Sequence, residues 1–262
     1  MTPIRDLDLR KLNSLTKYPS IPTYHALGER GSLLDDTVSF AGESLVVTEK
    51  VDGTNSRIIL MSDGFYLIGS REELLHAKGD LIHNPALGIV DTLRPVADRV
   101  SSIHRVLAGS VVTIYLETYG GKTTAAAKQY TSHCEFGYRV FDVNRIALDR
   151  IDGDLEAIAV WRENGGQGFL NEAELREFAE AAQLELTPRI AVVDSIPTTI
   201  EDTHDWLRMT IARTLVALDP DASGKPEGVV VRTADRSRIA KIRFEDYQRH
   251  AKRNSPGRGD RG

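Results

Sequence analysis

The sequence predicts an α+β fold of antiparallel strands with helices between them, for three reasons. Residues 110–120, SVVTIYLETYG, and residues 226–233, PEGVVVRT, are short apolar runs typical of strands. Residues 171–183, NEAELREFAEAAQ, show a helical pattern that opens with a capping box, Asn171 and Glu174. Strands and helices of these kinds follow one another along the whole chain without internal repeats. Such a mixture is typical of an α+β domain.

In the N-terminal half, residues 17–25 form an extended lead-in marked by prolines, and residues 45–69 are expected to form two or three strands. Within this region, VVTEKVDGTNSRIIL places an Asp-Gly pair between two apolar runs, which predicts a tight β-hairpin. Residues 83–107 are expected to be helical after Asn84-Pro85, with a break or kink at Pro95.

In the C-terminal half, residues 135–144 are expected to form a strand, as are residues around 184–193. A helix is expected around residues 200–218. Residues 226–233 and 237–247 are then expected to pair as two strands joined by a polar turn. We assign residues 1–248 to one domain and residues 249–262 to a basic, disordered tail.

Composition is that of an ordinary globular protein of 262 residues, 41% hydrophobic and 27% charged. The sequence shows no apolar run long enough to span a bilayer and no secretory signal, which predicts a cytoplasmic protein without a membrane partner. Its single cysteine, Cys134, excludes an intrachain disulfide. The net charge is −5, but residues 225–262 hold 11 Lys or Arg against 5 Asp or Glu. This basic part is either a phosphate-binding face or a solvated tail.

Several predicted strands carry charged residues whose role is open from the pattern alone. Lys50 stands two residues before the Asp-Gly pair and is either a solvated charge or a catalyst. Lys241 and Arg243 share one strand face, opposite Ala240 and Ile242, and form either a solvent-facing edge or a phosphate-binding pair.

Three further strand residues are equally ambiguous. Glu117 ends its strand beside Gly120-Gly121, where backbone can approach a ligand, or is a solvated carboxylate. Glu227 precedes three valines and fits a plain charge at the start of a strand. Phe141, in YRVFDV, fits a core aromatic as well as a platform for a cofactor.

Taken in order, these residues resemble the motifs of the covalent nucleotidyltransferase superfamily, which contains polynucleotide ligases and capping enzymes. Lys50, Glu117, Phe141, Glu227 and Lys241 match its motifs I, III, IIIa, IV and V. Within the superfamily the chain is most similar to the RNA ligase 2 family, which includes RNA-editing ligases. The motif continues as EKVDGTN, with Asn55 where DNA ligases typically have arginine, and KYPSI upstream resembles the N-terminal signature of that family.

This resemblance implies an ATP-dependent RNA ligase with a nucleotidyltransferase, or adenylation, domain of antiparallel sheets flanked by helices. Lys50 would attack the α-phosphate of ATP to form a lysyl-AMP, and AMP would pass to an RNA 5′-phosphate. An RNA 3′-hydroxyl would then displace AMP and seal the strand. A lysine is nucleophilic only when neutral, a form that desolvation and nearby cations favour. Lys241 and Arg243 would supply those cations and neutralise charge on the phosphate.

The resemblance also implies the residues that bind ATP and a divalent cation, Mg²⁺ or Mn²⁺. Phe141 would stack on adenine, with Tyr138 as the less favoured substitute, while Glu49 and the Val51 backbone would read the adenine edge. Glu227 and Glu117 would hold the hydrated metal or the ribose, and the two roles are not separated. The remaining expected contacts are made by Asp52, Gly53, Asn55 (to ribose or phosphate) and Arg71 (to the RNA 5′-phosphate).

Only 19 residues follow Arg243, too few for the OB-fold of DNA ligases and capping enzymes or for a helical second domain. We therefore expect no OB-fold. Two alternatives to a complete RNA ligase remain open. The first alternative is a minimal ATP-dependent DNA ligase. The second is a self-adenylylating, RNA-binding subunit of an RNA-repair complex, which needs a partner protein to seal RNA.

Overall fold

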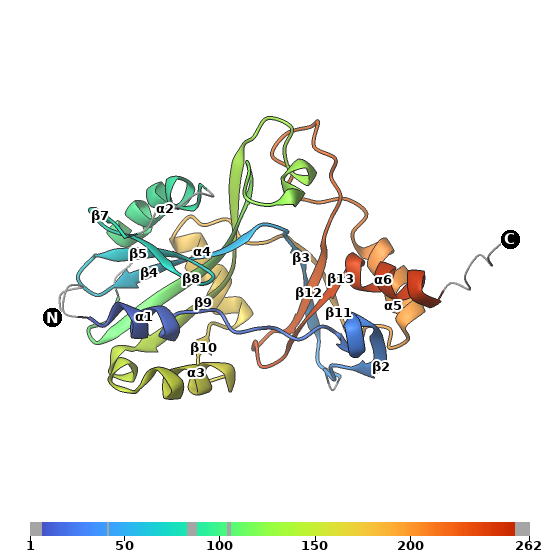
Figure 1. Ribbon diagram of the computed structural model, residues 1–262, viewed down its shortest axis with the longest axis horizontal. Helices are drawn as coiled ribbons and strands as arrows, with labels where there is room; N and C mark the ends of the chain where they lie inside the picture. Colours follow the sequence, from blue (N-terminus) through green and yellow to red (C-terminus); the bar gives the residue numbers. More distant parts are fainter. Residues whose placement is uncertain (1–6, 41, 83–87, 104–105, 255–262) are drawn as a thin grey trace, which may run out of the picture. The chain divides into compact units, whose positions relative to one another are not determined.

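The computed structural model describes residues 7–40, 42–82, 88–103 and 106–254 (Figure 1). The chain divides into two compact units, each assembled from separate segments. Unit 1 contains Met1–Ser20, Val51–Thr187 and Val216–Gly224. Unit 2 contains Ile21–Lys50, Pro188–Leu215 and Lys225–Gly262. The chain passes from unit 2 to unit 1 at the peptide bond between Lys50 and Val51, inside the predicted nucleophile motif.

Unit 1 is built on a seven-stranded antiparallel sheet in the order β10-β9-β8-β4-β5-β6-β7. One face packs against helices α2 (Ile89–Ile103) and α4 (Glu172–Ala181), and the other against α1 (Leu9–Leu15) and α3 (Leu155–Glu163). Two short 3₁₀ helices, η3 (Ala125–Gln129) and η4 (Leu148–Asp152), follow the two longest strands. The strands are β4 (Thr54–Met61), β5 (Tyr66–Ser70), β6 (Leu74–Ala77), β7 (Asp80–Leu81), β8 (Ser110–Gly120), β9 (Phe136–Ala147) and β10 (Gly168–Phe169).

Unit 2 is built on a four-stranded antiparallel sheet in the order β11-β3-β12-β13, accompanied by a two-stranded sheet and two helices. Leu45, Val47, Val229, Val231 and Ile242 form the core of its buried face. The elements are β1 (His25–Leu27), η2 (Glu29–Gly31), β2 (Leu33–Thr37), β3 (Leu45–Lys50), β11 (Arg189–Val193), α5 (Ile200–Thr210), β12 (Gly228–Thr233), β13 (Ile239–Arg243) and α6 (Phe244–Asn254).

The predicted α+β class is confirmed, and several of its elements are found where the sequence indicates. Helix α4 begins with the expected capping box, in which Asn171 and Glu174 exchange side-chain and backbone hydrogen bonds. Strands β12 and β13 pair antiparallel as predicted. Helix α2 continues through Pro95, so the chain does not break there, and the alternative of a kink stays a prediction. The predicted start near Asn84 lies outside the described residues.

The predicted hairpin at Asp52-Gly53 is wrong. Strand β3 pairs with β11 and β12, whereas β4 pairs with β5 and β8, so the two flanking strands belong to different sheets. The glycine is needed for close packing: a Cβ at Gly53 would collide with the carbonyl oxygen of Thr118 and lie 2.8 Å from Tyr119 Cβ. The Asp-Gly pair therefore serves as a tight crossing between sheets instead of a hairpin turn.

Two C-terminal expectations are also corrected. Helix α5 ends at Thr210 instead of extending to residue 218, and the residues after it form an irregular segment that begins with Ile211 in an extended conformation. Strand β13 ends at Arg243, and Phe244 already begins α6. Because α6 reaches Asn254, the first part of the predicted disordered tail, residues 249–254, is helical; residues 255–262 lie outside the described residues. The domain boundaries at 1–248 and 249–262 remain a prediction.

None of the helices in the described ranges combines the length and apolar character that crossing a membrane requires.

Candidate active site

The predicted nucleophile and both predicted cations lie on one face of the unit 2 sheet. Lys50 and Arg243 are each the register partner of Gly228, on opposite sides of β12, and Lys241 precedes Arg243 by two residues. Register partners in an antiparallel pair point to the same face, as do residues i and i+2 of one strand. The three side chains therefore project to the same side, opposite the buried Val47, Val229 and Ile242 face.

Gly228 lies between Lys50 and Arg243 in the sheet and places no side chain between them. A Cβ there would collide with the backbone carbonyl of Ile242. Neighbouring strands are about 4.8 Å apart, so the two cationic residues start from backbone positions roughly 10 Å from each other. Long side chains from these two positions can converge on one small anion.

Lys50 forms an ion pair with Glu227, with 2.6 Å between Nζ and Oε2. The side chains of Lys50 and Glu227 are only 24% and 15% exposed, so water screens the pair incompletely. The sequence predicts both residues at the site but does not predict that they bind each other. The pair holds the amine at the end of β3.

Arg243 is held by a partner that the sequence reasoning missed. Its Nε and Nη2 donate to the two carboxylate oxygens of Asp246, both at 2.9 Å, and Asp246 is fully buried in the first turn of α6. Burial acts to lower the pKa of Arg243, but the hydrogen bonds from Asp246 outweigh it and hold the pKa above its ordinary value. The signal in the sequence is an acid three residues after the arginine, within reach only once a helix begins at Phe244.

Glu49 lies on the buried face of β3, opposite Lys50. Its Oε2 accepts a hydrogen bond from the Leu215 backbone at 2.8 Å, and its Oε1 accepts one from the Thr214 hydroxyl. These donors belong to the irregular segment that follows α5, and they satisfy a buried carboxylate that needs hydrogen-bond donors. Its predicted contact with adenine stays a prediction.

In unit 1, residues of the nucleophile motif meet the predicted Glu117. The Gly53 amide donates to Glu117 Oε1 at 3.1 Å, and Asn55 is the register partner of Glu117 across β4 and β8. Within the described part of the chain, the Oδ1 atom of Asn55 is buried without a hydrogen-bond partner. A buried acceptor of this kind costs free energy until a donor fills it, which is what a bound ligand can supply.

Phe141 occupies a β-bulge in β9, because Tyr115 pairs with Asp142 while Leu116 pairs with Val140. Bulges re-aim a side chain and are common beside active sites. The half-buried Phe141 ring packs edge-to-face on Tyr18, whose hydroxyl donates to Asp142 at 2.8 Å. Tyr138 packs against the core formed with α2 and α4. That Phe141 and not Tyr138 stacks on adenine stays a prediction.

Tyr130 is a second residue that the sequence reasoning missed. Its hydroxyl accepts a hydrogen bond of 2.6 Å from the Asp52 amide. The side chain is fully buried and packs with Tyr119, Val51 and Val216. The segment that follows the predicted nucleophile is thus fixed by Tyr130 at Asp52 and by Glu117 at Gly53. Nothing in the sequence around Tyr130, AAAKQYTSH, predicts this contact.

Arg71, predicted to meet an RNA end, lies in the turn after β5 with its side chain 61% exposed. The backbone of this turn is held by the fully buried Arg57, which donates to Ser70 O at 2.7 Å and to Arg71 O at 3.2 Å. Arg57 also binds the side chain of Asn13. Burial lowers the pKa of Arg57 to about 10. The position of this turn is therefore fixed by a guanidinium whose burial costs free energy.

Replacing Arg57 with Met is expected to lower the free energy of unfolding by about 3 kcal/mol, because the variant removes the donor to the part-buried carbonyls of Ser70 and Arg71. Arg145→Met, at an exposed position of the same sheet, serves as the matched control and should change stability by less than about 0.5 kcal/mol. Urea unfolding of both variants measures the difference. Equal stability of Arg57→Met and the wild type would show that water satisfies these carbonyls.

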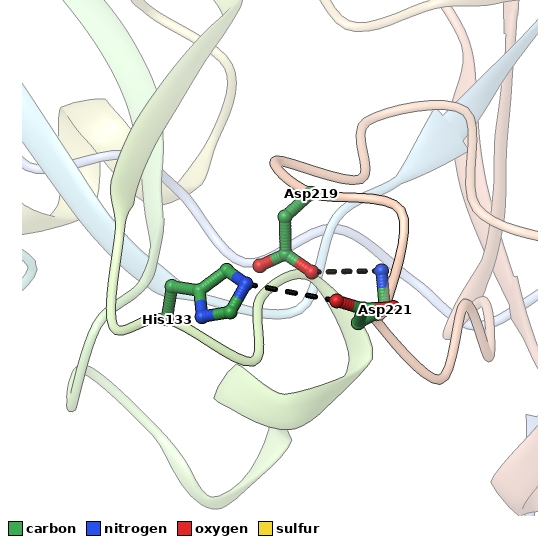
Figure 2. A group of neighbouring side chains, drawn as sticks. All are labelled: His133, Asp219 and Asp221. Atoms are coloured by element: carbon green, nitrogen blue, oxygen red, sulfur yellow. Dashed lines mark hydrogen bonds and ion pairs between the residues drawn. The ribbon is translucent and has the colours of Figure 1, made fainter.

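Among the residues that the structure describes, His133, Asp219 and Asp221 form one group whose ligand atoms lie within 4.8 Å of one another (Figure 2). Asp219 is already saturated: Oδ2 accepts from Thr131 Oγ1 and Ser132 N, and Oδ1 from Ser132 Oγ and Asp221 N. These bonds hold the pKa of Asp219 well below its usual range. A carboxylate has about four acceptor positions, so none is left for an ion. The group is a clasp between two loops.

An ion-paired lysine at a strand end, beside two cations on the same face, is the arrangement expected of a covalent nucleotidyltransferase. The family model for RNA ligases matches residues 43–249, which is most of the chain. The chain therefore belongs to the RNA ligase family. A search of curated proteins found no match.

The fold is also that of solved structures of Naegleria gruberi RNA ligase. An apo mutant is 13% identical with a TM-score of 0.52, over 80% of this chain and 52% of that one. A mutant with ATP and Mn is 13% identical with a TM-score of 0.52, over 91% and 63%. A mutant with AMP and Mn is 14% identical with a TM-score of 0.53, over 89% and 64%. The chain thus spans between about half and two thirds of the length of these structures.

Proposed function

We propose that this protein is an ATP-dependent RNA ligase that forms a lysyl-AMP at Lys50, transfers AMP to an RNA 5′-phosphate and seals it to a 3′-hydroxyl. One observation carries the proposal: Lys50 pairs with Glu227 on the sheet face that also holds Lys241 and Arg243, in a chain of the RNA ligase family. The solved ligases with ATP or AMP and Mn support the choice of ATP as the nucleotide.

The first step follows from the residues of unit 2. Neutral Lys50 Nζ bonds to the α-phosphorus of ATP while the bond to the β-phosphate oxygen breaks, and pyrophosphate leaves with the bonding electrons. Glu227, at 2.6 Å from Nζ, is the carboxylate placed to take the amine proton and pass it to water. Lys241 and Arg243 neutralise charge that builds up on the phosphate. Asp246 keeps the Arg243 guanidinium in one orientation, which reduces the ordering needed during reaction.

Unit 1 supplies groups that fit a nucleotide. The half-buried Phe141 ring offers an apolar face for adenine, and the unfilled Asn55 Oδ1 offers an acceptor for a ribose hydroxyl. The carboxylates of Glu117 and Glu227 are oxygen donors of the kind that Mg²⁺ or Mn²⁺ prefers, and a bound ion would add positive charge near the α-phosphate. Arg71, exposed at its turn, would meet the RNA 5′-phosphate.

Strand joining by the isolated protein tests the proposal. With ATP and Mg²⁺, the wild type should join labelled RNA carrying 5′-phosphate and 3′-hydroxyl ends, and Lys50→Ala should not. Matched DNA ends test the minimal DNA ligase, which the family match does not favour. Formation of lysyl-AMP without joining of any RNA would contradict the complete reaction and support the subunit of an RNA-repair complex that needs a partner protein. A cytoplasmic location stays a prediction.

Tyr130→Phe is expected to slow lysyl-AMP formation by about tenfold while leaving the fold intact. Phenylalanine keeps the packing on Tyr119 but leaves the Asp52 amide unpaired, and a lost buried hydrogen bond costs about 1–3 kcal/mol. Tyr66→Phe is the matched control: Tyr66 is equally buried and donates to Asp98, away from the motif. Single-turnover rates of AMP transfer to the protein measure both variants. Equal rates for Tyr130→Phe and the control would remove the positioning role of Tyr130.

A further inference from the structure

A groove of about 840 Å³ opens in unit 1, between the ends of β8 and β9, and the reaction described above does not use it. One wall is the segment that connects these strands and contains η3, and the other is part of the loop that carries Asp221 and Ser223. Its lining consists of Gly121, Lys122, Thr124, Ala125, Ala127, Lys128, Thr131, Ser132, Cys134, Asp221 and Ser223.

The two walls are fixed to each other by hydrogen bonds. Asp219, which lies beside Asp221 in Figure 2, accepts hydrogen bonds from the Thr131 hydroxyl and from the backbone amide and hydroxyl of Ser132. Further along, the Ser223 amide donates to the Lys128 carbonyl at 3.1 Å. The groove is therefore present before any ligand arrives, so a ligand does not need to order these loops.

The charge of the groove suits a phosphodiester. Lys122 and Lys128 line it with exposed side chains that can follow a phosphate. The lining carboxylate, Asp221, lies 3.6 Å from His133 Nε2, which offsets part of its charge when the imidazole is protonated. The hydroxyls of Thr131 and Ser132 already donate to Asp219, whereas Thr124 Oγ1 accepts from the Ala126 amide and can still donate to a ligand. The two alanines supply apolar surface.

An exposed aromatic ring lies at the rim of this groove. Phe136, the first residue of β9, is 43% exposed. Its ring packs against Gly121, where any side chain would collide with it, and a Cβ at Gly88 would lie 2.7 Å from it. Both glycines therefore let the backbone lie close to this ring, which restricts its movement while part of it stays exposed.

We propose that this groove binds an unpaired stretch of the RNA substrate, with a base stacked on Phe136 and its phosphates contacted by Lys122 and Lys128. Aromatic platforms beside basic grooves are the usual means of holding single strands without sequence preference. The inference rests on the proposed function for the identity of the nucleic acid. It adds a substrate site that is separate from the residues that react with ATP.

Cys134 provides a direct test, because it lines the groove, is exposed and is the single cysteine of the chain. A 5′-phosphorylated single-stranded oligouridylate, added without ATP, should slow alkylation of the wild type by iodoacetamide, measured by intact mass. Uridylate avoids competition from a base that resembles adenine. Unchanged alkylation at RNA concentrations that saturate binding would overturn the proposal. Equal protection by inorganic pyrophosphate would also overturn it, since the groove would then take free phosphate.

Two variants measure the contributions separately by fluorescence anisotropy of the same RNA. Phe136→Ala should weaken binding by about tenfold through loss of stacking. Lys122→Ala with Lys128→Ala should reduce the slope of log K against log salt by about 1.4, or about 0.7 for each phosphate contact. Phe65→Ala, an equally exposed phenylalanine elsewhere in unit 1, and Lys78→Ala are the matched controls and should bind as the wild type does.

The outcome is independent of whether the protein forms lysyl-AMP. Phe136→Ala and the double lysine variant should form lysyl-AMP with ATP at the wild-type rate, because neither changes a residue that meets ATP. A wild type that forms no adduct would remove the proposed function, whereas Cys134 protection is measured without ATP. Variants that bind RNA as tightly as their controls would overturn only the assignment of the groove.

Discussion

Lys241→Ala is expected to raise the barrier to lysyl-AMP formation by about 2–4 kcal/mol, which is about 30- to 1000-fold in rate. The lysine lies on the same sheet face as Lys50, and in the proposed mechanism it neutralises charge on the phosphate as the bond forms. Its neighbours Ala240 and Ile242 point to the core, so the substitution should leave the melting temperature near the wild-type value. A Lys241→Ala protein that melts far lower would make this lysine a structural residue.

Arg243→Ala should have a similar kinetic cost, but it should also destabilise the protein. Removing the guanidinium leaves the buried Asp246 carboxylate, among the ion pairs of the described residues, with Arg249 at 3.7 Å. An uncompensated buried charge costs several kcal/mol. The double variant Arg243→Ala/Asp246→Ala separates the two effects, since it removes the buried charge together with its partner. It should recover most of the stability and none of the rate.

Lys241 and Arg243 should also act together. If both meet the same phosphate, the double variant should lose less activity than the sum of the two single losses, and a double-mutant cycle of single-turnover rates measures this. Fully additive losses would show that the two cations act on different groups.

The sequence predicts those parts of the fold that depend on local pattern. The capping box of α4 and the pairing of β12 with β13 follow from neighbouring residues, and both are confirmed. The Asp-Gly hairpin fails for a tertiary reason. The strands on either side of Gly53 find partners in different sheets, and a local turn signal carries no information about such partners.

The same division holds for the site. Strand alternation correctly places Lys241 and Arg243 on one face, because periodicity determines side-chain direction. Asp246, Tyr130 and Arg57 were missed because each acts through a contact that only the folded chain creates. Tyr130, for example, is 78 residues away from Asp52, whose amide donates a hydrogen bond to the Tyr130 hydroxyl. The β-bulge that re-aims Phe141 is also invisible in the sequence, since it is defined by the register with β8.

Intact-mass spectrometry after incubation with ATP and Mg²⁺ tests the central claim most directly. We expect one added AMP, held by an acid-labile and base-stable phosphoramidate bond, which maps to Lys50 on proteolysis and is absent from Lys50→Ala. Lys78→Ala, at an exposed lysine of the other unit, is the control and should carry the adduct as the wild type does. A wild type without an adduct, or an adduct that persists in Lys50→Ala, would contradict the assignment of Lys50 as the nucleophile.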